Sequence, residues 1–351
     1  MGSLDGTHSR AVAKAWPMNG KALGEREPLR EASWTMIPKA DCLILLGAKP
    51  HETQPLLSAL IRKNILERGI KVSILGEMDL VPPFVSSYFP VKEEKLPRLV
   101  KAFREAVLDG GKKGKPKQGK PKEGKRKEAV DVPSLLKEAG LSRQDTKAFY
   151  AMVEEFRSST NPLLLAGETI TGLQNLAAFQ DAVKLALWKG LGEGDVLRLM
   201  VLKAYGNSAG AWKLGLSSNG DSKGKALWKA GLVLLGSPKD MNSDALTQLR
   251  GLDFLGVISP YFPEALADRA HVIIPKRLWM EEFGSFTSLD GWETGAKPKV
   301  LEAPEGVKES LEILGALADG IGFRHKYKSW GEVSEKAEKA IRLWTPVKKE
   351  K

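Results

Sequence analysis

The segment Leu252–Glu293 constrains the fold more than any other part of the sequence. It contains two short apolar runs, Phe254–Ile258 and His271–Ile274, which are separated by a proline-bounded stretch, Pro260–Asp268. Each run has the length and the bounding turn residues of a buried strand, and the stretch between them suits one helical turn. Because the chain must return to the same end of the sheet before the second strand begins, this order predicts a parallel pair.

The loop after the second run carries the polar residues of this segment. Pro275 ends the run, because proline lacks the N–H group that a sheet ladder needs. Glu281, Glu282, Phe283 and Gly284 follow in an acidic, aromatic, glycine-containing loop. The loop leaves the predicted sheet at the carboxyl ends of its strands, where α/β folds bind ligands. The two glutamates are adjacent and cannot face each other, which argues against a paired-carboxylate site.

The same strand–helix–strand pattern occurs earlier in the chain. Asp41–Gly47 is predicted to be a strand, Pro55–Arg68 a helix and Val72–Leu75 the next strand. We expect this helix to have one apolar face, formed by Leu56, Leu57, Leu60, Ile61 and Ile65. The turn Gly47–Pro55 places backbone N–H groups where a ligand phosphate can bind, but it lacks the G-x-G-x-x-G pattern of nicotinamide-binding folds.

Further elements extend this pattern along the chain. They are the predicted helices Val132–Ala139, Ser142–Ser158 and Val307–Gly320, and the predicted strands that begin at Asn161 and Ala230. Two βα repeats, over residues 40–110 and 160–275, follow from these elements. They predict an α/β fold with an open, mostly parallel sheet and helices on both of its faces.

Composition and cysteine content limit the class of protein. With 351 residues, 42% of them hydrophobic and 28% charged, the chain can form one or two packed cores. It has no apolar run of about eighteen residues to span a bilayer, and its first residues lack the apolar core of a signal peptide. The single cysteine, Cys42, excludes an intrachain disulfide and a chain-borne iron–sulfur cluster, and its place in an apolar strand predicts a core residue. We therefore expect a reducing, cytoplasmic compartment.

The net charge of +11 is concentrated in one segment. Nine basic residues and two acidic ones lie between Gly110 and Glu128. Because this segment has no apolar side chains to bury, we expect a flexible, solvated insertion over residues 110–129. It can serve as a solubilising linker, or dock an acidic partner or an anionic membrane surface. Nucleic acid is not expected as a partner, because no aromatic residue lies among the lysines to stack on bases.

Several motifs give the sequence a resemblance to a known family. Glu264–Pro275 reads E-A-L-A-D-R-A-H-V-I-I-P, and Glu281–Gly291 reads E-E-F-G-S-F-T-S-L-D-G. These segments resemble T-E-T-A-x-x-A-D-V-V-L-P and E-K-x-G-T-F-T-N-x-E-G-R, a signature of the molybdopterin oxidoreductase superfamily. Two residues depart from that signature, since His271 replaces the usual Asp and Trp292 stands where the family has Arg.

Three more segments continue the resemblance. Ala40–Pro55 is similar to A-D-x-I-L-L-I-G-x-N-P-x-x-x-H-P-V, with Lys49 in place of the usual Asn and Gln54 in place of the usual His. Asn161–Gly172 is similar to A-K-N-P-A-I-L-x-G-x-G-x-T-x-x-x-x-G. Ala230–Pro238 is similar to A-L-Y-x-x-G-E-N-P, with one serine in place of the Glu–Asn pair.

The resemblance implies a fold and a site. The fold is that of domains 1–3 of formate dehydrogenase and DMSO reductase, in which loops at the strand ends lie near a pterin guanine dinucleotide. The residues that match those loops, as a vestigial cofactor site, are Gly47, Lys49, His51, Gly167, Thr169, Asn207, Gly236, Ser237, Glu282, Phe283 and Gly284. The Asn207 loop is shorter than its counterpart in cofactor-using relatives, and acceptors for guanine are depleted. We therefore expect that the cofactor has been lost.

The resemblance and the charge pattern together divide the chain into four expected parts. These are a lead-in segment over residues 1–37, a first βα lobe over 38–109, the lysine-rich insertion over 110–129, and a second βα lobe with C-terminal helices over 130–345. Full-length members of the superfamily also carry a cysteine-rich cluster domain, a metal ligand before the first βα unit and a C-terminal β-barrel domain. We expect this chain to begin after that ligand and to end before the barrel, so that it offers no thiolate to molybdenum or tungsten.

Three functions remain open. The favoured one is a non-catalytic, scaffold-like subunit in the peripheral arm of NADH:quinone oxidoreductase, respiratory complex I, whose large cluster-bearing subunit has a similar molybdopterin-type region. The alternative is the cofactor-holding part of a split molybdenum or tungsten enzyme of the formate dehydrogenase or formylmethanofuran dehydrogenase type. The third is a stand-alone nucleotide-binding protein. No Ser/His/Asp triad, zinc-ligand cluster or P-loop pattern favours hydrolytic catalysis.

The favoured function sets the expected cofactors and partners. We expect no cofactor in this chain, or molybdopterin guanine dinucleotide in the alternative, and no catalysis by the chain alone. Electron transport would pass through iron–sulfur and flavin-bearing partner subunits. The expected location is cytoplasmic, peripheral to the inner membrane as part of that complex.

Overall fold

The computed structural model describes two compact units, one within Thr7–Ala209 and one within Gly210–Lys351. The described residues are 18–19, 27–78, 85–108, 131–171, 175–203, 205–214, 229–236, 246–247, 249, 251–290, 293–297, 299–323, 327 and 329–344. The lysine-rich insertion, Ser237 and most of the lead-in segment lie outside them. Within the described part of the chain, no helix is long and apolar enough to cross a membrane.

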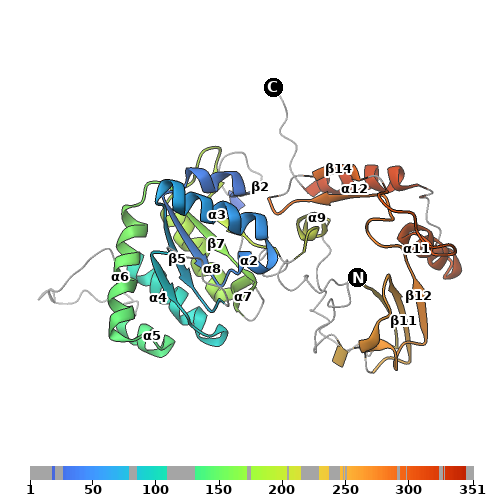
Figure 1. The fold of residues 1–351 in the computed structure, drawn as a ribbon, viewed down its shortest axis with the longest axis horizontal. Helices are drawn as coiled ribbons and strands as arrows, with labels where there is room; N and C mark the ends of the chain where they lie inside the picture. The colour runs from blue at the N-terminus through green and yellow to red at the C-terminus, as the bar shows by residue number, and fades with distance from the viewer. Residues whose placement is uncertain are drawn as a thin grey trace, which may run out of the picture. The chain divides into compact units, whose positions relative to one another are not determined.

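A five-stranded parallel sheet forms the centre of the N-terminal unit (Figure 1). In their order across the sheet, the strands are β6 (Ser87–Phe89), β5 (Lys71–Leu75), β4 (Cys42–Leu46), β7 (Pro162–Ala166) and β9 (Leu199–Val201). Every residue of β4 and β7 is buried, as expected for central strands that are covered on both faces. The chain runs outward from β4 to β5 on one side and from β7 to β9 on the other. The boundary between β4 and β7 is therefore a topological switch point.

Helices cover both faces of this sheet. They are α2 (Pro50–Thr53), α3 (Pro55–Arg68), α4 (Leu96–Leu108), α5 (Val132–Ala139), α6 (Arg143–Ser158), α7 (Glu168–Thr171) and α8 (Leu176–Trp188). Right-handed crossovers place α3 on one face and α4 and α8, which pack on each other, on the opposite face (Figure 1). The smaller elements are β1 (Met18–Asn19), β2 (Glu27–Pro28), β3 (Arg30–Glu31), η1 (Trp34–Lys39), η2 (Glu93–Lys95) and β8 (Val196–Leu197).

Helix α3 has the bounds predicted from the sequence, but its buried face contains fewer residues than predicted. Gly69 ends the helix in the left-handed conformation, with φ of 63°. Leu57, Ile61 and Ile65 are buried, whereas Leu56 is 84% exposed, so its predicted place on the apolar face is wrong. The buried residues are spaced by four and share one side. Leu56 precedes Leu57 by one residue, which turns it about 100° away.

The structure divides the chain at a different place from the two lobes expected from the sequence. β7 pairs with β4 in register from Cys42 opposite Pro162 to Leu46 opposite Ala166. The strands at 162–166 and 199–201 therefore belong to the first sheet. Helices α4, α5 and α6 carry the chain to the far side of β4, and the sequence of a strand does not state which neighbour it pairs with.

The C-terminal unit contains a three-stranded parallel sheet. Its strands, in order, are β10 (Ala230–Leu234), β11 (Phe254–Ser259) and β12 (Val272–Pro275). Gly256 lies opposite Val272, so the parallel pair predicted from the apolar runs is confirmed. The other elements of this part are α9 (Ser208–Lys213), η4 (Glu264–Leu266), β13 (Gly284–Thr287), β14 (Glu293–Lys297), α11 (Ser310–Gly320) and α12 (Trp330–Trp344). The prediction of a loop after β12 is partly wrong, because β13 within this segment pairs with β14 as an antiparallel hairpin.

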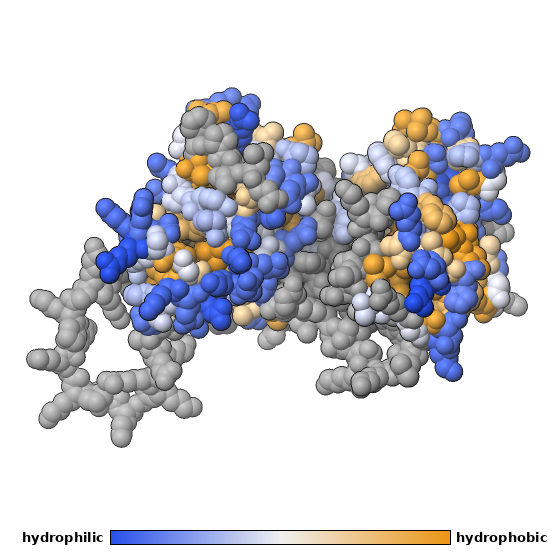
Figure 2. Space-filling view, turned by 60° about the horizontal axis from the view of Figure 1, so that its bottom comes forward, coloured by the Kyte–Doolittle hydropathy of each residue, from blue (hydrophilic) through white to orange (hydrophobic). Residues whose placement is uncertain are grey.

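The two faces of the C-terminal sheet differ in burial. On one face, Leu255 and Val257 are fully buried against Leu266, with Leu246 and Leu249 packed beside them. On the other, Leu232, Leu234, Phe254 and Val272 are 49%, 51%, 46% and 44% exposed. We call this second face the open face. Figure 2 shows hydrophobic residues gathered on the surface of this unit, which is the right-hand one in the view.

Candidate functional site

Two glycines bring the loops after β4 and β7 into direct contact at the switch point. A Cβ atom on Gly167 would lie 2.0 Å from the carbonyl oxygen of Gly47 and 2.3 Å from Cα of Ala48. A Cβ atom on Gly47, whose φ is 57°, would lie 2.7 Å from Cβ of Thr169. The N–H of Gly167 also donates to the carbonyl of Leu46 at 3.0 Å. Close packing of the two loops is therefore sufficient to require both glycines.

Lys49 precedes helix α2 and His51 lies within it, just after β4, and both side chains face one carboxylate. Nζ of Lys49 is 3.5 Å from Oε1 of Glu52, and Nε2 of His51 is 3.4 Å from the same oxygen. Sequence reasoning missed the role of Glu52, although its place in the same turn was the available signal. The carboxylate offsets the positive charge that a phosphate would meet at this turn.

An ion pair between a buried lysine and a half-buried glutamate is linked to this turn and was not predicted. Lys203, which is buried after β9, places its Nζ 3.0 and 2.9 Å from the two carboxylate oxygens of Glu31. Nε2 of Gln54 donates to the carbonyl of Lys203 at 2.6 Å. Gln54 replaces a histidine of the family motif, and here its amide ties the turn to the end of β9. No local sequence pattern signals a pair between residues this far apart.

Thr169 and Asn207 are the remaining predicted site residues of the N-terminal unit. Thr169 is half-buried in α7 against the Gly47 loop, and its carbonyl accepts from Nδ2 of Asn175 at 2.5 Å. Asn207 is exposed in the turn before α9, where the N–H of Tyr205 donates to Oγ of Ser208 at 3.2 Å. The structure thus brings Gly47, Gly167 and Thr169 together.

The predicted site residues of the C-terminal unit have separate environments. Gly236 is exposed at the end of β10, and Ser237 lies outside the described residues. Phe283 is exposed, with Nζ of Lys299 5.5 Å from the centre of its ring. Gly284 begins β13 at a bulge in the hairpin. A Cβ atom on Gly284 would meet no atom within 4 Å, so packing does not require glycine there.

Glu282 is held at the start of α11. Its Oε1 accepts hydrogen bonds from N of Ser310 at 2.7 Å and from Oγ of Ser310 at 2.9 Å. Next to it, Oε1 of Glu309 is 2.5 Å from Nη1 of Arg277 and 3.0 Å from Nζ of Lys299. We call these five residues the α11 clasp. In the clasp, the carboxylate of Glu282 satisfies N–H and O–H donors of the first helical turn.

The described residues offer few side chains that could ligate a metal ion. They contain no group of three or more His, Cys, Asp or Glu side chains that could hold a metal ion. Cys42 is buried in β4, as predicted for a core residue. Burial raises the pKa of its thiol to about 12, with smaller contributions from Glu155 and Asp41, so the thiol stays protonated at neutral pH.

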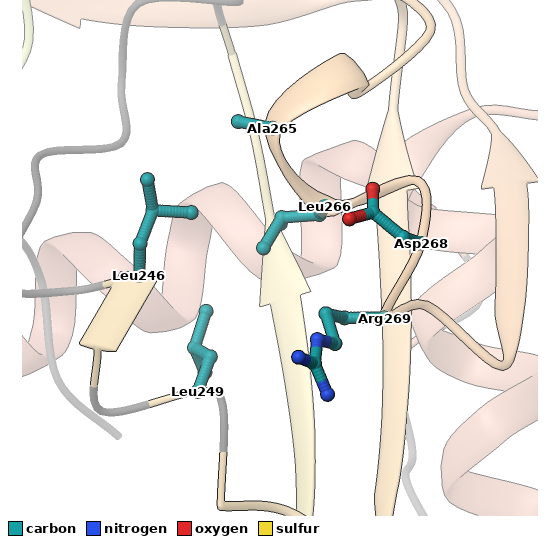
Figure 3. Close-up of a pocket in the computed structure, with 6 residues that line it drawn as sticks. All are labelled: Leu246, Leu249, Ala265, Leu266, Asp268 and Arg269. Carbon is teal, nitrogen blue, oxygen red and sulfur yellow. The ribbon is translucent and has the colours of Figure 1, made fainter.

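A small pocket lies beside the covered face of the C-terminal sheet. Its volume is about 90 Å³, and Leu246 and Leu249 face Leu266, Asp268 and Arg269 across it (Figure 3). Ligand pockets for drug-sized molecules measure roughly 300–1,000 Å³. This pocket is therefore too small for a dinucleotide, and it contains none of the predicted site residues.

Comparison with known protein families shows to which family the chain belongs. The family model for molybdopterin oxidoreductase matches residues 16–320, which is most of the sequence. The chain belongs to the molybdopterin oxidoreductase family. The resemblance of the strand-end motifs to this family is thereby confirmed at the level of the family. No curated protein matches the sequence.

Solved structures support the same fold. One match belongs to the formyltransferase/hydrolase complex FhcABCD from Methylorubrum extorquens in complex with methylofuran, with a TM-score of 0.54, 13% identity, and coverage of 90% of this chain and 82% of that chain. Another is acetylene hydratase from Pelobacter acetylenicus, with a TM-score of 0.54, 11% identity, and coverage of 91% and 50%. The chain therefore spans about half the length of acetylene hydratase. At these identities the matches show the fold, an α/β arrangement with mostly parallel sheets, which confirms the predicted class.

Proposed function

We propose that this molybdopterin oxidoreductase family member is a non-catalytic, scaffold-like subunit of a multi-subunit redox complex, and that it has lost both the metal and the pterin. The observation that carries this proposal is the internal use of the family's cofactor loops. Gly47 and Gly167 serve the contact between two loops, and Glu282 caps α11 within the clasp. Three residues of the loops that would meet a dinucleotide are thus engaged in holding the fold.

The donor set also fits a metal poorly. Molybdenum and tungsten sites of this family use a thiolate, selenolate or serine oxygen, and soft metals favour deprotonated sulfur. The single thiol belongs to Cys42, which is buried in the middle of β4 and protonated at neutral pH. No step through a metal or a pterin is therefore derived for this chain.

The sequence motifs favour one particular complex. We propose the peripheral arm of an NADH:quinone oxidoreductase, because the motifs and the compact 200–235 segment resemble the molybdopterin-type region of its large cluster-bearing subunit. The partners would be iron–sulfur and flavin-bearing subunits, and electrons would pass through those partners only. The lysine-rich segment between Gly110 and Glu128 would meet an acidic partner or the anionic surface of the inner membrane.

A second candidate is the cofactor-holding part of a split enzyme of the formate dehydrogenase or formylmethanofuran dehydrogenase type. Its support is the similarity to a chain of FhcABCD, a formyltransferase/hydrolase complex whose structure contains methylofuran and of whose chain 82% is covered. In that case Lys49 and Asn207 of the N-terminal unit, which are partly and fully exposed, are residues that would hold the dinucleotide. The partner chain would supply the metal ligand.

Guanine nucleotide binding separates the two candidates. The probe is GDP, the nucleotide part of the dinucleotide, added at increasing concentration to the purified full-length chain during thermal unfolding. Scaffold function predicts an unchanged unfolding temperature. A rise of about 2 °C or more at high GDP, absent with ADP, contradicts it, because a ligand stabilises the fold only by binding to it. A pterin-containing enzyme of the family, stripped of cofactor, is the positive control.

Partner identity separates the two complexes. The tagged chain is isolated from its native source, and the subunits recovered in stoichiometric amounts are identified by mass spectrometry. Flavin absorbance and iron in the isolated complex support NADH:quinone oxidoreductase. A formyl-transferring subunit without flavin supports the second candidate.

A further inference from the structure

His271 directly precedes β12, and both its side chain and its backbone bond to one residue of β11. Nδ1 of His271 accepts a hydrogen bond from the N–H of Leu255 at 3.1 Å, and the N–H of His271 donates to the carbonyl of Leu255 at 2.8 Å. The imidazole ring also stacks on Phe254, with ring centroids 5.4 Å apart and an angle of 29° between the planes. One histidine therefore pairs with both backbone groups of a fully buried residue.

The side chain of His271 extends the pairing of the two strands by one residue. The register of β11 with β12 begins at Gly256, which lies opposite Val272, so Leu255 stands just before the paired positions. A buried backbone N–H group needs an acceptor, because leaving it unpaired costs the free energy of removing that group from water. Nδ1 of His271 is thus the acceptor at the place where the strand pairing starts.

Only a neutral imidazole ring can accept this hydrogen bond. The neutral ring has one protonated nitrogen and one acceptor nitrogen, whereas both nitrogens of the charged ring are donors. With Nδ1 as the acceptor, the proton of the neutral ring lies on Nε2. Protonation of Nδ1 would set two N–H groups against each other, and histidine is the side chain that changes charge between about pH 5 and 8. The bond to Leu255 is therefore present in neutral solution and lost on acidification.

The other charged groups at this end of the sheet come from each of the adjoining segments. Lys229 precedes β10 and Asp253 precedes β11. Asp268 and Arg269 lie in the turn before β12. All four residues are exposed, so water and salt screen their charges, and the acidic and basic groups balance. Among the described residues, His271 is therefore the group at this contact whose type titrates between about pH 5 and 8.

The family signature has Asp at the position of His271, and the two side chains can make the same contact. Oδ1 of an aspartate and Nδ1 of a histidine are both bonded to Cγ, so each can reach the same backbone N–H group. A carboxylate remains an acceptor down to about pH 4. The histidine therefore replaces an acceptor that is constant near neutral pH with one that is lost on acidification.

We propose that His271 makes the contact between β11 and β12 sensitive to pH. The neutral ring bonds to Leu255 and holds the residues that lead into β12 against β11. The charged ring cannot make this bond, so the start of β12 separates from Leu255 in acid. Because β12 leads into the signature segment that begins at Glu281, the strand that carries this segment is held less firmly at low pH. The inference does not depend on the proposed scaffold function, since it rests on contacts within one unit.

Hydrogen exchange at the amide of Leu255 tests the proposal in the full-length chain. Exchange is measured at about pH 7.5 and about pH 5.5, on either side of the usual titration of histidine. It is expressed as protection relative to the unfolded chain, which removes the intrinsic effect of pH. We expect protection of Leu255 to fall roughly three- to tenfold in acid, the effect of losing one hydrogen bond. The amide of Val257, further along β11, should change by less than about twofold. Equal protection of Leu255 at both pH values, or equal losses at both amides, would overturn the proposal.

Two variants separate the acceptor from the aromatic ring. His271→Asp keeps an acceptor bonded to Cγ, so protection of Leu255 should stay at its neutral value in acid. His271→Phe keeps the stacking on Phe254 but has no acceptor, so protection should be low at both pH values. His51→Gln, in the other unit, is the matched control and should keep the wild-type response. Thermal unfolding shows whether each variant folds. A wild-type pH response in folded His271→Phe contradicts the proposal.

The protonation of the ring provides a measurement on the wild-type chain alone. The chain has four histidines, and in uniformly ¹⁵N- and ¹³C-labelled protein the ring of His271 is identified by its sequential NMR assignment. In neutral solution we expect the proton on Nε2, with Nδ1 unprotonated and hydrogen-bonded. A proton on Nδ1 in neutral solution would overturn the proposal, because that nitrogen could not accept from Leu255.

Discussion

The two parallel sheets of this chain differ in how completely the described residues of their own unit cover them. In the N-terminal unit, α3 covers one face and α4 and α8 cover the other, so that β4 and β7 are buried along their whole length. In the C-terminal unit, one face is packed and the open face leaves large apolar side chains about half exposed. The central strands of both sheets are rich in apolar residues. Among the described residues, the first sheet is therefore a packed core on both faces, whereas the second is packed on one face and only partly buried on the other.

The strongest test of the difference between the two units is to truncate one large apolar side chain in each of them. Phe103 of α4 is fully buried, with its ring 5.2 Å from that of Phe156 and 6.4 Å from that of Phe149. Phe103→Ala is expected to lower the free energy of unfolding by about 3–5 kcal/mol, because it removes these contacts and leaves a cavity. Leu234→Ala on the open face should lower it by about 1 kcal/mol or less in the isolated chain.

Urea unfolding of the isolated chain provides both values. Hydrogen exchange of peptides from β4 and β11 assigns each loss to its unit. Equal losses for the two variants would contradict the comparison, because they would show that Leu234 is as well packed as Phe103.

The loop contact at the switch point should be the next most sensitive feature. Gly167→Ala places a Cβ atom 2.0 Å from the Gly47 carbonyl oxygen, so the backbone of one loop must move. We expect a loss of about 2–4 kcal/mol in the N-terminal unit. Gly206→Ala is the matched control, since its Cβ atom would meet nothing within 4 Å, and it should change stability by less than about 0.5 kcal/mol. A tolerated Gly167→Ala would show that the loops do not require close packing.

The α11 clasp predicts a smaller effect, confined to the C-terminal unit. Glu282→Ala removes the acceptor for N and Oγ of Ser310, which should cost about 1 kcal/mol, the usual effect of losing a helix cap. Faster hydrogen exchange in the first turn of α11 is the measurement. Exposed Glu302 serves as the control, and Glu302→Ala should leave that turn unchanged. Unchanged exchange in Glu282→Ala would remove the evidence that the signature loop has a structural role.

The smallest expected effect comes from Asp41, which should make the stability of the N-terminal unit depend on pH. Burial raises the pKa of Asp41, but hydrogen bonds from Ser159, Thr160 and Asn161 outweigh it, and the pKa is lower than usual. A carboxyl group with a lowered pKa in the folded state stabilises the fold above its unfolded-state pKa of about 3.9, and this stabilisation is lost as the pH falls through the folded-state pKa.

Asp41→Asn should therefore destabilise the chain at pH 7, by less than about 1 kcal/mol since the group is only partly buried, and the difference should vanish in acid. Thermal unfolding across this pH range gives the comparison. Glu305→Gln, at an exposed carboxylate, should show no such trend. A difference between wild type and Asp41→Asn that persists in acid would contradict the assignment.

Much of the fold could be predicted from local sequence, because local signals determine it. Apolar runs bounded by turn residues predicted β4, β5 and β11. The Ser142–Asp145 capping box and the left-handed Gly69 define the ends of their helices. The pairing of strands could not be predicted in the same way. β7 pairs with β4 across two strands, six described helices and the lysine-rich insertion, and the lengths of these segments do not encode which strand is the neighbour.

The roles of the candidate site residues were harder still to predict from the sequence. The motifs identified which loops to examine, and the family match confirmed their origin. Their present roles depend on long-range partners, such as Glu31 for Lys203 and Ser310 for Glu282. A motif specifies residue types at a spacing, and it contains no information on which distant group will occupy their hydrogen-bonding capacity.

The most direct test of the scaffold function is to measure cofactor content. Molybdenum, tungsten and iron are determined by elemental analysis, and pterin by fluorescence after oxidation, on the full-length chain purified alone and in its native complex. The proposed function predicts no pterin, molybdenum or tungsten in either sample, and iron only in the complex. Stoichiometric pterin with molybdenum or tungsten retained by the chain would contradict it, and would make the loops at Gly47 and Gly167 candidates for a working cofactor site.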